Sequence, residues 1–189
     1  MTTRRAFMQI AAAAAAPVAL GVAPALASSA SGHRFALFEG SSASAAVFAR
    51  RARLHGSAAL EVHQGDITDV WLKAVRPAWR SANASITGVT TPAALFCLEQ
   101  FAWAQGMRVV FHAEHLLLPD GGVEHQVQRT LQPLSSATLR RAGERWPQRL
   151  ADALSRQRPR NMFRPGPSLA ALEPTLPAGA TLLTSWIIA

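Results

Sequence analysis

The sequence predicts an α/β fold, a three-layer sandwich in which helices cover both faces of a mainly parallel sheet that carries an antiparallel hairpin at one edge. Three observations predict it. Short apolar runs alternate with helical stretches, the order that builds parallel strand–helix–strand units. Helical stretches begin near serine, threonine or aspartate, and two of them end at glycine. A Pro-Asp-Gly-Gly turn separates two later runs, as in a hairpin.

The first strand–helix unit is predicted over residues 33–55. Residues 33–38 form a short strand, and the turn Glu39-Gly40-Ser41-Ser42 supplies N-cap candidates for a helix over residues 43–55. Arginines in the last turn, followed by Gly56, are the expected end of that helix.

The second unit begins with a strand over residues 59–63. Asp66 or Thr68 can cap the helix that follows, and Pro77 cuts or kinks its end. Its apolar stripe has helical spacing and consists of Leu72, Val75 and Trp79.

The third unit contains the clearest helix signals. A strand over residues 85–89 is followed by Thr91 as N-cap and Pro92 in the first turn, where proline is favoured. The helix then covers residues 93–105 and stops at Gly106.

A fourth strand is predicted over residues 107–112, continuing toward Leu118, and residues 123–130 return antiparallel after the turn. The alternation of strands and helices up to this point resembles the order of flavodoxin-like and Rossmann-like folds. That resemblance implies a parallel sheet, with the hairpin extending one edge.

The C-terminal third is predicted to be helical over residues 135–156, with Pro147 splitting the helix. Residues 158–177 contain five prolines and are expected to form an extended surface segment. Residues 181–188 are apolar and partly β-branched, which predicts a final strand.

The N-terminus has the order of parts of a secretory signal peptide. Arg4 and Arg5 precede an uncharged, alanine-rich run, and Ala25-Leu26-Ala27 offers small residues for a signal peptidase. We therefore expect cleavage near Ala27, a mature α/β domain over residues 28–189, and a periplasmic location. The run is a poor stable membrane anchor, because it is mostly alanine interrupted by proline and glycine.

The stretch from Thr3 to Gln9, with its arginine pair and Phe7, resembles a twin-arginine export signal. This resemblance implies folding before export, with the twin-arginine export machinery and signal peptidase as partners. An ordinary secretory signal and an uncleaved anchor are the alternatives. Beyond its predicted topology, the mature chain resembles only uncharacterised twin-arginine-signal proteins of proteobacteria, and that resemblance implies no function.

The charge of the mature chain bears on its partners, and its cysteine content bears on its core. Removal of residues 1–27 takes Arg4 and Arg5 from the 19 basic residues and leaves all 11 acidic ones, so the mature net charge is about +6. An exported protein rarely meets nucleic acid, so we expect solvated arginines without a partner, with an acidic partner or anionic lipid as the alternative use of the charge. Cys97 cannot form an internal disulfide, and we expect it to be a small buried residue of the core.

The predicted ligand site lies where three parallel strands end. In such sheets ligands bind beyond the carboxyl ends of the strands, and helix N-termini suit phosphates and carboxylates. Three loops there combine glycine with hydroxyl or carboxylate side chains. The alternative is that these side chains only cap helices. The candidate residues are Ser41, Ser42, Asp66, Thr68, Gly88, Thr90 and Thr91.

The predicted hairpin suggests a second site. If Leu118 lies opposite Val123, the side chains of His112, Glu114 and His125 share one face, a set that can bind a metal or form an acid–base pair. A Glu–His contact on a partly solvated hairpin is the alternative, and we assign no metal there.

We therefore expect an exported, soluble α/β protein that binds a small ligand or a partner protein, as an accessory subunit of another exported protein. The alternatives are a small periplasmic hydrolase or transferase using the strand-end cleft, and a metal-binding protein using the hairpin histidines. No GxSxG, GxGxxG or P-loop motif is present, and no cofactor is indicated.

Overall fold

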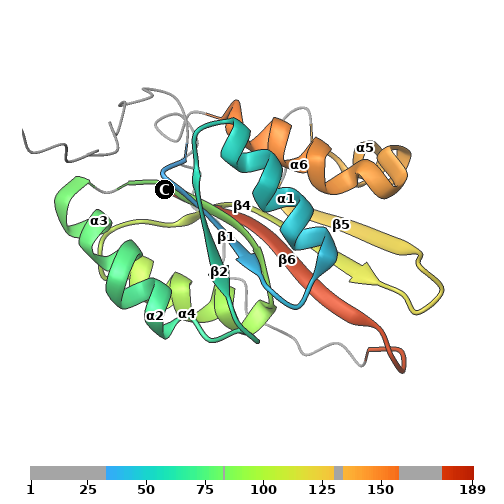
Figure 1. Cartoon of the computed structure of the whole chain (residues 1–189), viewed down its shortest axis with the longest axis horizontal. Helices are drawn as coiled ribbons and strands as arrows, with labels where there is room; N and C mark the ends of the chain where they lie inside the picture. The colour runs from blue at the N-terminus through green and yellow to red at the C-terminus, as the bar shows by residue number, and fades with distance from the viewer. Residues whose placement is uncertain (1–32, 83, 130–133, 158–175) are drawn as a thin grey trace, which may run out of the picture.

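The computed structural model describes residues 33–82, 84–129, 134–157 and 176–189. The predicted signal peptide and nearly all of the proline-rich segment lie outside these residues. The described chain forms an α/β fold around a six-stranded sheet with the order β2-β1-β3-β6-β4-β5 (Figure 1). The strands are β1 (Phe35–Glu39), β2 (Ala58–Val62), β3 (Ile86–Thr90), β4 (Val109–Leu117), β5 (Val123–Arg129) and β6 (Thr181–Ile188).

The prediction of a mainly parallel sheet is wrong. Only β1–β2 and β1–β3 pair in parallel, whereas β3–β6, β4–β6 and β4–β5 are antiparallel. The difference between the predicted and the observed sheet comes mainly from the C-terminal strand, β6. Because β6 is antiparallel to both β3 and β4, the first four strands still run in one direction, and β6 is inserted between the third and the fourth. The antiparallel edge hairpin of β4 and β5 is confirmed.

The central place of β6 suits its composition. Its last six residues are all buried, as expected of a strand that is covered on both faces. An edge position would have exposed a row of backbone groups beside these apolar side chains. The strand order therefore follows from burial, although the strand–helix alternation alone predicted a different place.

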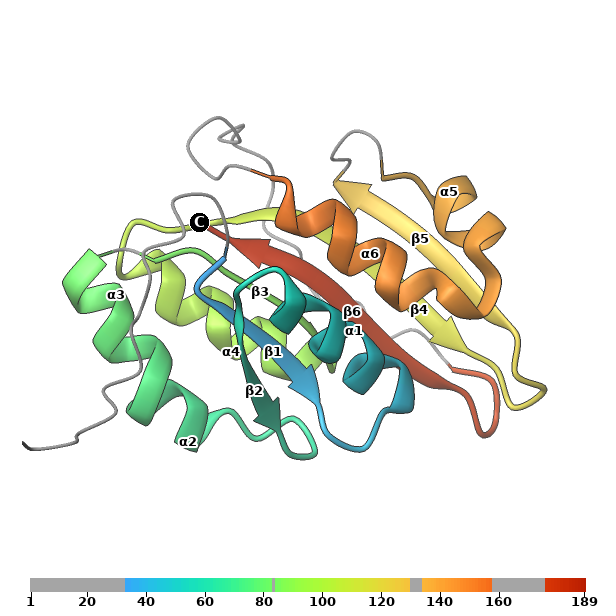
Figure 2. The same ribbon diagram turned by 45° about the horizontal axis from the view of Figure 1, so that its top comes forward.

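Helices cover both faces of the sheet, so the three-layer arrangement is confirmed. In Figure 2, α1 and α6 cross in front of the strands and α4 lies behind them. The first face carries α1 (Ala43–Leu54), α5 (Ser136–Ala142), a 3-10 turn (Gly143–Arg145) and α6 (Trp146–Ser155). The second carries α4 (Pro92–Trp103) and one continuous helical stretch, made of α2 (Thr68–Val70), a π-helical turn (Trp71–Val75) and α3 (Arg76–Ala82).

Two core clusters fill the layers. Phe48, Phe111 and Trp146 belong to the cluster beneath α1 and α6. Trp79 and Trp186 belong to the cluster beneath α3 and α4. Large aromatic side chains thus anchor both faces, each burying a substantial apolar area.

Two details of the helices differ from the prediction. Pro147 does not split the C-terminal helix; it lies in the first turn of α6, and the break comes at Gly143, which has a φ of 52°. The π-helical turn adds a residue to one turn, which rotates the stripe. Leu72 is consequently 50% exposed, while Val75 and Trp79 are buried as predicted.

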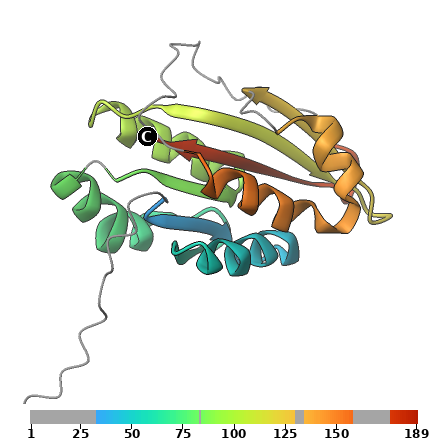
Figure 3. The same cartoon turned by 90° about the horizontal axis from the view of Figure 1, so that it is seen from above.

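A charged contact joins α1 to α6, which lie side by side in Figure 3. Asp152 on α6 accepts hydrogen bonds from the Arg51 guanidinium and pairs with His55 Nε2 at 2.7 Å. The hydrogen bonds from Arg51 hold the pKa of Asp152 below its usual value.

Candidate functional site

The three predicted loops do lie at one edge of the sheet. The parallel strands β1, β2 and β3 all end there, at Glu39, Val62 and Thr90. The loops after β2 and β3 touch, because a Cβ atom on Gly65 would lie 2.9 Å from Thr91 Oγ1.

Glu39, at the end of β1, occupies the middle of this edge. Its carboxylate is 1% exposed and accepts hydrogen bonds from the backbone N–H of Gln64 at 2.9 Å and of Gly65 at 3.1 Å. The Ser41 hydroxyl also donates to it, at 3.1 Å. The amide groups of the second loop therefore already hold an anion, supplied by the chain itself. The sequence predicts Glu39 only as a turn residue. Its position directly after an apolar strand is the feature that could have indicated a buried carboxylate.

The remaining polar residues of these loops have structural partners. Ser42 caps α1 by accepting a hydrogen bond from Ala45 N, and Thr91 caps α4 in the same way from Ala94 N. Asp66 accepts a hydrogen bond from Thr68 N at 2.8 Å, and hydrogen bonding to the Thr68 side chain and backbone lowers the pKa of the exposed carboxyl group. Helix capping accounts for Ser42 and Thr91, and a local turn accounts for Asp66, so ligand binding at the edge stays a prediction.

Gly88 and Thr90 lie inside the sheet. Thr90 is fully buried, and its Oγ1 accepts a hydrogen bond from Trp186 Nε1 at 3.0 Å. Gly88 faces the same indole, where an added Cβ would lie 2.8 Å from Trp186 Cε2. The glycine makes room for a core side chain.

The predicted histidine–glutamate cluster on the hairpin is wrong. The observed register places Leu117, and not Leu118, opposite Val123. A shift of one residue exchanges the faces of a strand. His125 therefore lies opposite His115 and on the other face from His112 and Glu114.

The pair that does form lies beneath α6, with His115 buried and His125 half-buried. His115 Nδ1 lies 2.8 Å from His125 Nδ1, and His115 Nε2 lies 2.8 Å from the Ser185 hydroxyl. The Trp146 ring lies over His115, with ring centroids 4.4 Å apart. Burial lowers the pKa of His125 to about 4 and that of His115 well below its usual value. His125, His115 and Ser185 thus form a hydrogen-bonded network. Because His115 and Ser185 are fully buried, this network is a neutral polar part of the core.

The most unusual surface of the described chain is the outer side of α4. This helix has a single charged residue, Glu99, and its side chain is buried. Its exposed positions are mostly apolar: Phe96 is 51% exposed, and Phe101 and Trp103 are each 37% exposed. A helix at a protein surface normally has the opposite arrangement. We call Phe96, Cys97, Phe101 and Trp103 the α4 surface.

Cys97 belongs to this surface, so its predicted burial is wrong. Since α4 is apolar on nearly every side, the periodicity of its sequence could not show which side faces the sheet. Leu95, Leu98 and Ala102 form the buried side instead.

Neighbouring aromatic residues hold Phe101 of the α4 surface in place. Phe101 stacks on Trp71 of the preceding helical stretch, with ring centroids 4.3 Å apart and planes inclined by 17°. Trp71 in turn meets the buried Trp79 edge to face at 5.6 Å. Phe101 is thus held against residues that reach the core, and the exposed apolar side chains of α4 form a surface that suits contact with another protein.

Comparison of the chain with protein-family models, curated proteins and solved structures finds no match. Within the described ranges, no helix has both the length and the apolar character needed to cross a membrane. Among those same residues, no three histidine, cysteine, aspartate or glutamate side chains are grouped as a metal site would require.

Proposed function

We propose that this chain is an exported accessory protein that binds another exported protein through the α4 surface. One observation carries the proposal: the only charge on α4 is buried while Phe96, Cys97, Phe101 and Trp103 face outward. Exposing these side chains has no benefit for folding, because burying a phenylalanine is worth about 1.5–3 kcal/mol. A partner that covers the α4 surface recovers that free energy.

The partner's contact surface is apolar and carries little charge at its centre. The α4 surface offers no charged group, so a charged residue placed against it would lose water without gaining a partner. Aromatic side chains of this kind dominate binding energies when they lie at the centre of an interface. Export in the folded state, which the N-terminal arginine pair favours, lets such a complex form before translocation.

An enzyme that uses the strand-end edge has less support. The capping of Ser42 and Thr91, the burial of Thr90 and the occupation of the edge by Glu39 leave few groups for a substrate. The hairpin histidines give a metal-binding function no support, because the three residues proposed for it do not share a face.

Site-specific photocrosslinking in the exporting cell tests the proposal. A photoreactive phenylalanine analogue at Phe96 should crosslink one exported protein, whereas the same analogue at Leu54 should not. Leu54 is a matched control, because it is 75% exposed and lies on α1, on the other face of the sheet.

The captured protein must then bind the purified chain. We expect Phe96→Gln with Trp103→Gln to weaken that binding at least tenfold, about 1.4 kcal/mol, and Leu54→Gln to leave it within twofold. Equal weakening by both variants contradicts a specific surface. If light scattering instead shows that the wild-type chain is a dimer and the double variant a monomer, a second copy covers α4 and the proposal is wrong.

A further inference from the structure

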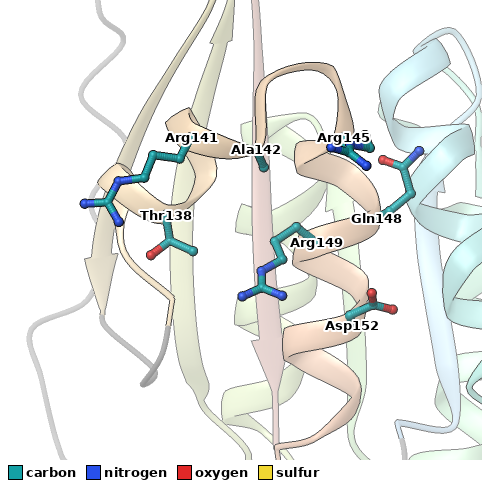
Figure 4. Close-up of a pocket in the computed structure, with 7 residues that line it drawn as sticks. All are labelled: Thr138, Arg141, Ala142, Arg145, Gln148, Arg149 and Asp152. Carbon is teal, nitrogen blue, oxygen red and sulfur yellow. The ribbon is translucent and has the colours of Figure 1, made fainter.

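A concave site lies on the other helical face, between α5 and α6. It is an open hollow with a volume of about 450 Å³, and Figure 4 shows the side chains around it. A volume of this order suits a small ligand. The residues that line the site are Thr138, Arg141, Ala142, Arg145, Gln148, Arg149 and Asp152.

The three arginines of this site form no ion pair with an acidic side chain of the described residues. Among the described residues, ion pairs within 4.0 Å join Arg51 and His55 to Asp152, and Lys73 to Asp69. Asp152 is the only acid among the described residues that line the pocket, and it is already paired with Arg51 and His55. Arg141, Arg145 and Arg149 therefore keep an uncompensated positive charge around one hollow.

Two of these arginines are placed unfavourably for the helix that carries them. Arg145 is the N-cap of α6 and Arg149 lies four residues later, a spacing at which like charges destabilise a helix, whereas Arg141 lies on α5, before the break at Gly143. Arg145 and Arg149 also lie at the N-terminus of α6, where the helix dipole disfavours cations. A bound anion reverses both effects, because it pairs with the guanidinium groups and is attracted to the same helix end.

We propose that this pocket binds a phosphate-type oxyanion, carried either by a small molecule or by a lipid headgroup. Guanidinium groups match such an oxyanion in charge and in hydrogen-bond geometry. Gln148 also lines the wall. The site lies across the sheet from the α4 surface, so anion binding and partner binding are separate properties.

Titration of inorganic phosphate, followed by thermal unfolding and by amide chemical shifts, tests the small-molecule source. Cosedimentation with vesicles of phosphatidylglycerol in phosphatidylcholine tests the headgroup source. The test variant is Arg145→Gln with Arg149→Gln. Its control is Arg76→Gln with Arg80→Gln, which removes the same charge at the same spacing from the exposed side of α3.

We expect the test variant to weaken phosphate or vesicle binding at least tenfold and the control to change it less than twofold. Binding to either probe supports the site. Binding to phosphate alone indicates a small molecule, binding to vesicles alone indicates a lipid headgroup, and binding to both shows that the site accepts either source. Equal weakening by test and control shows a diffuse effect of net charge and overturns the proposal, as does failure of the wild-type chain to bind either probe. If the double variant unfolds, Arg149→Gln alone replaces it.

Discussion

The indole of Trp186 donates its Nε1–H to Thr90 Oγ1 at 3.0 Å, and both residues are fully buried. Trp186 lies on β6 and Thr90 on β3, so this bond fastens the C-terminal strand to the third one. Gly88 leaves the space that the indole fills. The contact stabilises the antiparallel insertion that distinguishes this sheet from a parallel one.

We predict that Gly88→Ala destabilises the protein by about 1–3 kcal/mol, because the new methyl group meets the Trp186 ring and the Leu37 carbonyl oxygen, 3.0 Å away. Urea unfolding, followed by far-ultraviolet circular dichroism, measures the change. In the double variant with Trp186→Phe, part of the loss should be recovered, because the smaller phenylalanine ring leaves room for the new methyl group. Additive losses in the double variant would show that the clash is absent.

The elements of this fold were predictable, but the place of the last strand was not. All six strands and the caps at Ser42 and Thr91 follow from local patterns that act within a few residues. The insertion of β6 between β3 and β4 depends on contacts between residues about a hundred positions apart, such as Thr90 with Trp186. No local pattern encodes them.

The candidate sites depend on still finer detail. A single step of register decided that His125 meets His115 and not His112. Because nearly every residue of α4 is apolar, its sequence does not indicate which side of the helix faces outward. The arginines of α5 and α6 were visible as a four-residue series, but only the tertiary contact of Asp152 with α1 shows that they lack a counter-charge.

The buried histidines predict loss of stability in acid. Burial lowers the pKa values of His33, His115 and His125, the last to about 4, so the unfolded chain binds more protons than the native one below about pH 6.5. The free energy of unfolding should therefore be highest above about pH 6.5 and should fall as the pH drops toward 4. We expect a loss of at least about 2 kcal/mol between pH 7 and pH 4.5 in urea unfolding, because a lowering of the pKa from 6.5 to about 4 in His125 alone corresponds to roughly that much.

His125→Gln should flatten this pH dependence, because it removes one of the groups that the native state keeps neutral. His63→Gln is the control, since His63 is exposed and outside the network. An unchanged slope in the His125 variant would show that His125 binds its proton equally well in both states.

Cys97 offers a direct probe of the α4 surface. Since it is exposed, a thiol reagent should label the native protein at a rate within a fewfold of that of the urea-unfolded chain. Cys97→Ser should change stability by less than about 0.5 kcal/mol, as expected of surface positions. Slow labelling of the native protein would place Cys97 in the core after all. Protection that appears only on addition of the purified partner would map the interface to α4.

Export through the twin-arginine route predicts a specific defect. Arg4→Lys with Arg5→Lys preserves the charge of the N-terminus but removes the arginine pair that selects this route. We expect the double variant to accumulate uncleaved in the cytoplasm, while its domain stays folded and resistant to protease. Fractionation and mass measurement of wild type and variant give the result, and the purified variant should still bind the partner through α4. Normal periplasmic accumulation of the cleaved variant would instead assign the N-terminus to the general secretory route. The chain would then fold only after crossing the membrane, and the partner would have to meet it in the periplasm.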